Sequence, residues 1–241
     1  MVPDRFAPLL AELSPLADRF RGAGRRLYLV GGTVRDLLVG REGGWDVDAT
    51  TDARPDEIKS ILEGWADALW TQGERFGTIG ARRGDRDYEI TTHRAEAYEP
   101  ESRKPNVVFA DAIEVDLSRR DFTVNAMALE LTSDAPTLVD PFGGAADLAA
   151  HVLRSPIPPE ESFSDDPLRM LRAARFLAGY ELEPVPELVA AVTAMRHRLS
   201  IVSAERIRDE LDKLIVVDDP SAGLWFLNDT CLLYTSPSPR D

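Results

Sequence analysis

Residues 27–50 read LYLVGGTVRDLLVGREGGWDVDAT, and this stretch decides the fold. Leu27–Val30 is a short apolar run that predicts a buried strand. Gly31 and Gly32 break the run, and Thr33–Val39 then has the pattern of a helix. The sequence therefore predicts a strand, a tight glycine turn and a helix start in immediate succession.

Such a turn is typical of a phosphate cradle. Free backbone N–H groups point outward at the start of the helix, and the helix dipole favours an anion there. We predict that Gly31 and Gly32 form the cradle. Arg35, one helical turn further on, can add a charged fork to the same anion.

Asp46 and Asp48 fall where a second strand is expected. Side chains of a strand alternate between its faces, so both carboxylates point the same way and Val47 points into the core. Two carboxylates on one edge bind hard cations, and Mg²⁺ prefers a few carboxylates together with phosphate oxygens. Asp46 and Asp48 are therefore candidate metal ligands. The alternative interpretation is a polar turn after Gly43-Gly44.

The run Leu-Val-Gly-Gly-Thr-Val-Arg-Asp, followed by Trp-Asp-Val-Asp, resembles the head of bacterial CCA-adding tRNA nucleotidyltransferases and the related poly(A) polymerases. These are class II members of the polymerase-beta nucleotidyltransferase superfamily. The resemblance implies two Mg²⁺ ions on Asp46 and Asp48, which activate an RNA 3′-hydroxyl and stabilise the leaving pyrophosphate.

Two further strands are predicted at residues 76–81 and 87–92, joined by a turn at 83–85. Superfamily members often use a third carboxylate near the metal ligands, and Glu89 is the candidate on position alone. The alternative is an exposed strand glutamate. Residues 93–111 are polar and interrupted by proline, so we expect a long loop, which helps to switch nucleotide choice in the resembled family.

Residues 119–128, RRDFTVNAMA, are similar to a second signature of the family. Arg120 is predicted to grip triphosphate oxygens. Asp121 and Asn125 are four residues apart on a predicted helical face, so both can bond ribose hydroxyls. The alternative is an ordinary helix cap with apolar neighbours in the core.

Residues 165–176, DDPLRMLRAARF, carry a third signature. Asp166, Arg169, Arg172 and Arg175 recur every three residues and are predicted to lie along one side of a helix. A solvated, salt-bridged face is the alternative interpretation. The resembled family places its nucleotide-selecting Glu-Asp-x-x-Arg here, which maps the selecting pair to Asp166 and Arg169. Arg172 and Arg175 would hold phosphate or the base.

The chemistry of selection follows from hydrogen-bond patterns. Cytosine and adenine both present an exocyclic amine, which a carboxylate accepts, beside a bare ring nitrogen, to which a guanidinium donates. Uracil and guanine reverse this pattern and leave buried partners unpaired. Asp166 and Arg169 could thus act as a protein template. At Asp165 the family often has Glu, which is a conservative difference.

The composition limits the classes of protein. A net charge of −14 over 241 residues argues against a general nucleic-acid binder, so an RNA substrate needs a local basic patch or a further part of the protein. The sequence has no apolar run of about 18 residues and no secretory signal. We therefore expect a cytoplasmic protein without a membrane partner.

We predict an α+β fold. Residues 1–150 form a polymerase-beta-like nucleotidyltransferase head with a mixed, mainly antiparallel sheet, and residues 151–230 form an all-helical neck that selects the nucleotide. Residues 231–241, CLLYTSPSPRD, look like the translation of a sequencing-library adapter. We expect this tail to be non-native and without packed contacts, and the true protein to continue past Thr230.

The resemblance implies a template-independent, Mg-dependent nucleotidyltransferase that adds CCA, from CTP and ATP, to the 3′ end of tRNA. A poly(A) polymerase that adds AMP to RNA 3′ ends has the same active site, and the sequence does not separate the two. A third possibility of a different class is a nucleotide- or RNA-binding module without turnover.

Overall fold

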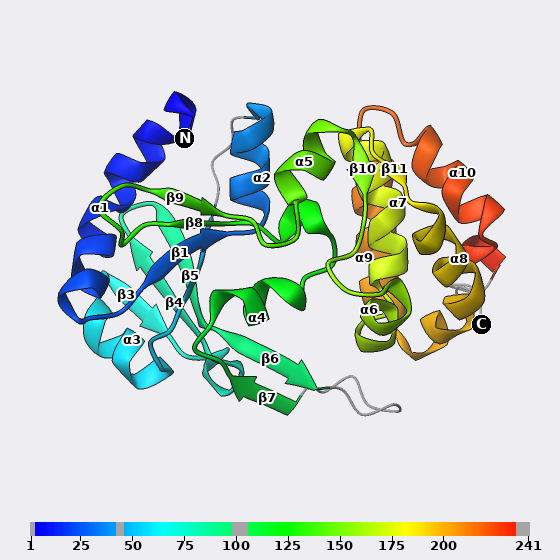
Figure 1. Ribbon diagram of the computed structural model, residues 1–241. Helices are drawn as coiled ribbons and strands as arrows, with labels where there is room; N and C mark the ends of the chain where they lie inside the picture. Colours follow the sequence, from blue (N-terminus) through cyan, green and yellow to red (C-terminus); the bar gives the residue numbers. More distant parts are fainter. Residues whose placement is uncertain (1–2, 42–45, 98–105, 235–241) are drawn as a thin grey trace. The chain divides into compact units, whose positions relative to one another are not determined.

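A computed structural model describes residues 3–41, 46–97 and 106–234 (Figure 1). The chain divides into two compact units. The first comprises residues 1–97, 105–120 and 125–145, and the second comprises 98–104, 121–124 and 146–241. The chain therefore enters the second unit briefly at Asp121–Val124 before it returns. The boundary near residue 150 stays a prediction.

The first unit is built on a seven-stranded sheet in the described part of the chain, with the order β3-β4-β5-β2-β1-β8-β9. The strands are β1 (Leu27–Val30), β2 (Val47–Thr51), β3 (Ala68–Trp70), β4 (Thr78–Arg83), β5 (Arg86–Thr92), β8 (Ala128–Glu130) and β9 (Thr137–Val139). Only β2 and β5 pair in parallel among these neighbours, and the other pairs are antiparallel. The predicted mixed, mainly antiparallel sheet is confirmed.

Four helices accompany this sheet in the described residues: α1 (Ala7–Gly22), α2 (Gly32–Val39), α3 (Pro55–Leu62) and α4 (Ile113–Ser118). Helices α1 and α3 pack against each other, α1 also against β1, and α3 against β4 and β5. Their apolar residues recur at helical spacing, as Leu9, Leu13, Leu16 and Phe20 do in α1, and all four are buried. Burial of this face packs α1 against β1.

The expectation of a long loop at residues 93–111 is wrong at both ends of that segment. Strands β6 (Arg94–Ala97) and β7 (Asn106–Phe109) pair antiparallel. Strand β6, Arg-Ala-Glu-Ala, has no β-branched or aromatic residue, and the three apolar residues of β7 come directly after Pro105-Asn106, so the sequence pattern does not distinguish these short strands from a loop. Residues 98–105, the centre of the expected loop, lie outside the described residues.

The second unit is mainly helical, as predicted. Its helices are α6 (Pro159–Asp165), α7 (Arg169–Tyr180), α8 (Pro186–Met195), α9 (Ala204–Ile215) and α10 (Ser221–Asp229), and α5 (Gly144–Ala149) leads into them. Two short strands, β10 (Val152–Leu153) and β11 (Glu183–Pro184), pair in parallel. Helix α7 packs against α9 and α10. A Cβ on Gly223 would lie 2.4 Å from the Ala174 carbonyl oxygen, so this glycine permits the close contact of α10 with α7.

The tail expected to lack packed contacts does not lack them throughout. Leu232 is fully buried in the short 3₁₀ helix Leu232–Tyr234 that follows α10. An apolar side chain beside an apolar core is buried whatever its origin, so the expectation is wrong for this residue. Residues 235–241 lie outside the described residues, and the adapter origin stays a prediction. None of the described helices combines the length and the apolar character that crossing a membrane requires.

Candidate nucleotide-binding and metal site

The glycine turn between β1 and α2 has the form that the sequence predicted. Gly31 has φ 74° and ψ −137°, a backbone conformation that residues with a Cβ rarely adopt. Helix α2 begins at the next residue, Gly32. A Cβ on Gly31 would lie 3.1 Å from Nη1 of Arg120. Glycine is therefore required both for the turn itself and for the approach of the arginine.

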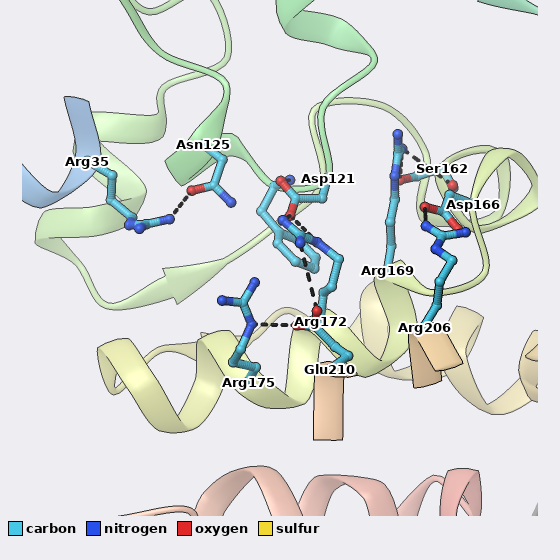
Figure 2. A network of polar contacts seen from close by, with 11 residues as sticks. Arg35, Asp121, Asn125, Ser162, Asp166, Arg169, Arg172, Arg175, Arg206 and Glu210 are labelled. Carbon is cyan, nitrogen blue, oxygen red and sulfur yellow. Dashed lines mark hydrogen bonds and ion pairs between the residues drawn. The ribbon is translucent and has the colours of Figure 1, made fainter. Parts of the chain in front are cut away.

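Arg35 is buried in the first turn of α2 and is held by protein groups. Its Nη1 donates to Oδ1 of Asn125 (Figure 2). Its Nε and Nη2 donate to the Asp36 carboxylate at 3.0 and 3.1 Å. The Arg35 guanidinium thus fixes the helix start to the segment around Asn125. Its predicted contact with an anion stays a prediction.

The carboxylates lie on neighbouring strands. Asp46 directly precedes β2, and both Asp46 and Asp48 are exposed while Val47 between them is buried. Strand β5 runs parallel to β2, and Glu89 is in register with Asp48. Residues paired in register point to the same face of a sheet, so Asp48 and Glu89 lie side by side.

This crowding changes the acidity of Asp48. The surrounding protein withdraws water from the carboxylate and raises its pKa, the negative charge of Glu89 and that of Asp46 raise the pKa further, and Arg120 opposes them. A divalent cation would neutralise this repulsion. The described residues contain no cluster of three His, Cys, Asp or Glu that could enclose a metal ion by themselves. The donor set nevertheless fits a hard cation that also binds phosphate oxygens.

The prediction that Asp121 and Asn125 share a helical face is wrong. This segment has only the 3₁₀ turn Thr123–Asn125, and the N–H of Thr123 donates to the Arg154 carbonyl at 2.8 Å instead of continuing a helix. In the second unit, Asp121 accepts from Nε and Nη2 of Arg172 at 2.9 and 2.5 Å. Asn125 belongs to the first unit. The spacing of four residues has no meaning without a continuous helix.

Asp166 was also misplaced, because α7 begins only at Arg169. Asp166 has φ −140° and ψ 101°, and it lies between α6 and α7. Its Oδ1 accepts from the Leu168 N–H at 3.2 Å, and its Oδ2 accepts from Nη2 of Arg206 at 2.8 Å. A residue before proline avoids helical conformation, so Pro167 was the signal that could have corrected the prediction.

The three arginines of α7 contact other polar side chains of the second unit, and two of them share Glu210 (Figure 2). Nη1 of Arg169, which is buried, donates to Oγ of Ser162 at 2.8 Å. Arg172 binds Asp121 and lies 4.0 Å from Glu210, and Arg175 donates to Glu210. The predicted ladder is thus a set of buried or half-buried ion pairs and hydrogen bonds within the second unit.

Glu210, which pairs with Arg172 and Arg175, was not predicted from the sequence. It lies on α9 and is almost completely buried. A signal existed, because Glu210 is three residues after Ile207 and four before Leu214, which are both core residues. A charge at such a core-facing position needs a partner of opposite charge.

Changing Glu210 to alanine should therefore destabilise the second unit. The variant leaves two arginines without their carboxylate. We expect the free energy of unfolding to fall by about 1–3 kcal/mol, a moderate loss because both arginine side chains are partly exposed to water. Urea unfolding measures the loss. The matched control is Glu205→Ala, which removes an exposed glutamate from the same helix. Equal stability of the two variants would contradict a structural role for the Glu210 pairs.

Comparisons with known proteins identify the family to which the chain belongs. Residues 27–154 match the family model described as the poly A polymerase head domain. Residues 181–235 match the one described as "Probable RNA and SrmB-binding site of polymerase A". The fold of the first unit and its glycine turn thus define a nucleotidyltransferase head. The chain belongs to the poly A polymerase head domain family, whose nucleotidyltransferases are metal-dependent.

Individual relatives carry a narrower description. The CCA-adding enzyme of Lactobacillus helveticus is 39% identical over 214 residues, which cover 88% of this chain and 51% of the relative. That of Levilactobacillus brevis is 38% identical over 228 residues, 94% of this chain and 55% of the relative. The Bacillus stearothermophilus CCA-adding enzyme in complex with CTP is 31% identical, with a TM-score of 0.83, covering 98% of this chain and 55% of that one.

A further solved structure is the Thermotoga maritima CCA-adding enzyme complexed with a tRNA. It is 27% identical, with a TM-score of 0.78, and the match covers 99% of this chain and 55% of that one. The chain thus spans about half the length of the curated relatives it matches.

Proposed function

We propose that this chain carries the transfer site and the nucleotide-selecting site of a template-independent RNA nucleotidyltransferase, which adds CCA from CTP and ATP to the 3′ end of tRNA. One observation carries the proposal: Asp48 lies in register with Glu89 and beside Asp46, in the same unit as the Gly31 turn and Arg120. The similarity to CCA-adding enzymes solved with CTP and with tRNA supports the choice of substrates.

Asp46 and Asp48 are the proposed metal ligands, and Glu89 is the proposed third carboxylate. Two Mg²⁺ ions held there would supply activation of the RNA 3′-hydroxyl and charge stabilisation of the leaving pyrophosphate. The chain's own groups then orient the nucleotide. Backbone N–H groups at Gly31 and Gly32, with Arg120, hold its phosphates in position.

The ribose and the base are assigned to the remaining candidates. Asp121 and Asn125 stay candidates for ribose hydroxyls, and Arg35 holds Asn125 in place. Asp166 and Arg169 are proposed to select the base. Each oxygen of a carboxylate has two lone pairs, so Asp166 can accept from an exocyclic amine while it binds the Leu168 N–H and Arg206.

Arg172 and Arg175, in the second unit, are proposed to hold phosphate or the base. Asp121 and Glu210 occupy only some of the N–H donors of the two arginines. Both arginine side chains are also partly exposed to solvent, so they can bind phosphate or base. A tRNA substrate also implies that the protein acts in the cytoplasm.

Poly(A) addition is the second candidate, because the family model that matches the first unit is described by that activity. The test supplies labelled CTP and ATP, separately, with a tRNA that ends before CCA and with an unrelated RNA. We expect CMP incorporation into the tRNA alone. AMP incorporation into both RNAs without CMP would favour poly(A) addition. Binding of nucleotide with no incorporation would favour a binding module without turnover.

A further inference from the structure

We propose that Asp116 is a positioning residue that holds Arg120 against the Gly31 turn, so that one edge of the Arg120 guanidinium meets the nucleotide phosphates. The inference rests on the proposed function and adds a residue to it that no sequence pattern singled out. Asp116, Arg120 and Gly31 all belong to the first unit.

Asp116 is a fully buried carboxylate on α4. Its Oδ1 accepts from Nε and Nη2 of Arg119 at 3.1 and 2.8 Å, and its Oδ2 accepts from Nη2 of Arg120 at 3.2 Å. Burial alone would raise the pKa of Asp116, but the two arginines keep it below its ordinary value. Asp116 is therefore a charged anchor that depends on both guanidinium groups.

Arg120 uses only part of its hydrogen-bonding capacity on this anchor. Its Nη1 lies where a Cβ on Gly31 would be only 3.1 Å away, and its Nε is buried without a hydrogen-bond partner among the described residues. A guanidinium is planar and rigid, so anchoring Nη2 on Asp116 also fixes the direction of Nη1. Nη1 therefore points toward the Gly31 turn, which forms the backbone cradle.

Arg120 is thus a cation that adjoins the glycine turn, in the same unit as the proposed metal ligands. A triphosphate held by a backbone cradle carries a concentrated negative charge, which a cation beside that cradle stabilises. Asp116 is fully buried, and the contact that links it to the turn runs through Arg120.

A double-mutant cycle separates this role from a merely structural one. The measurement is the dissociation constant of CTP in the presence of Mg²⁺, by calorimetry, with urea unfolding of each variant in parallel. The variants are Asp116→Asn, Arg120→Gln and the double substitution. The control is Glu114→Gln, an exposed carboxylate two residues earlier on α4.

We expect each single substitution to weaken CTP binding about tenfold, the double variant to bind no more weakly than Arg120→Gln, and the control to bind as the unchanged protein does. Additive losses of about a hundredfold, or normal binding by Asp116→Asn, would overturn the positioning role alone. If the unchanged protein binds no CTP, the proposed function fails first, and the two failures are thereby distinguished.

Arg120→Lys provides a second test, at a less buried position that does not depend on the folding of Asp116→Asn. The lysine keeps the charge and can pair with Asp116, but it cannot bridge Asp116 and the cradle as a planar fork does. We expect the same tenfold loss of CTP affinity as in Arg120→Gln. Full affinity in Arg120→Lys would show that charge alone suffices, which overturns positioning by Asp116.

Discussion

Replacing Asp46 with alanine is expected to lower nucleotidyl transfer by at least about a thousandfold, because metal ions contribute several kcal/mol to such reactions. The melting temperature should stay the same or rise slightly. Asp46 is exposed and lies outside β2, so it contributes little packing, and its charge disfavours the ionised form of Asp48. The measurement is the single-turnover rate of labelled CMP incorporation at saturating Mg²⁺.

Asp85→Ala is the matched control for that experiment. Asp85 is an exposed aspartate in the turn between β4 and β5, in the same unit. The control should transfer CMP at the normal rate. Near-normal transfer by Asp46→Ala would remove Asp46 from the metal site, and a comparable loss in Asp85→Ala would mean that the general negative charge of this unit is responsible.

Replacing Asp166 with alanine is expected to change the choice of base. The variant should lose about ten- to a hundredfold of its preference for CTP and ATP over UTP and GTP, since each unpaired buried group costs about 1–3 kcal/mol. Loss of the Leu168 hydrogen bond at the start of α7 should cost roughly 1 kcal/mol of stability. The measurement is incorporation of a single nucleotide from each of the four triphosphates on one RNA.

Arg206→Gln is the control, because it breaks the ion pair at Oδ2 of Asp166 and leaves the carboxylate in place. If Asp166 itself accepts from the base, the Arg206→Gln variant keeps most of its discrimination. If Asp166→Ala slows all four nucleotides equally and preserves their ratios, Asp166 is structural, and the base must be selected by other residues.

Short-range patterns predicted the first unit well. The strand, glycine turn and helix at residues 27–39 depend on local backbone preferences, which a sequence states directly. The alternation around Val47 likewise predicted that Asp46 and Asp48 would be exposed beside a buried valine. Glu89 was placed on position alone, and its register with Asp48 depends on a parallel pairing between strands that are distant in the chain.

The predictions failed where partners come from distant segments. Periodicity placed Asp121 with Asn125 and Asp166 with Arg169, yet Asp121 binds Arg172 and Asp166 binds Arg206. Residues three or four apart share a face only where one continuous helix runs through both of them. In both cases the backbone is interrupted, by the Thr123 to Arg154 hydrogen bond in one and by Pro167 in the other.

Buried carboxylates were the other omission. Asp116 and Glu210 each lie on an interior face of a helix and bind two arginines of a signature segment. Arg120, Arg172 and Arg175 were assigned to the nucleotide alone, without the carboxylates that orient them. A charged residue at an apolar position of a helix indicates such an anchor before the structure is known.

The most direct test of template-independent CCA addition is the sequence of the RNA product. The full-length product of the gene is incubated with a tRNA that ends before CCA and with all four triphosphates at equal concentration, and the new 3′ ends are sequenced. We predict that the ends gain cytidine, cytidine and adenosine in that order and then stop. A run of adenosines, the incorporation of uridine or guanosine at comparable frequency, or unchanged ends would contradict CCA addition by this protein.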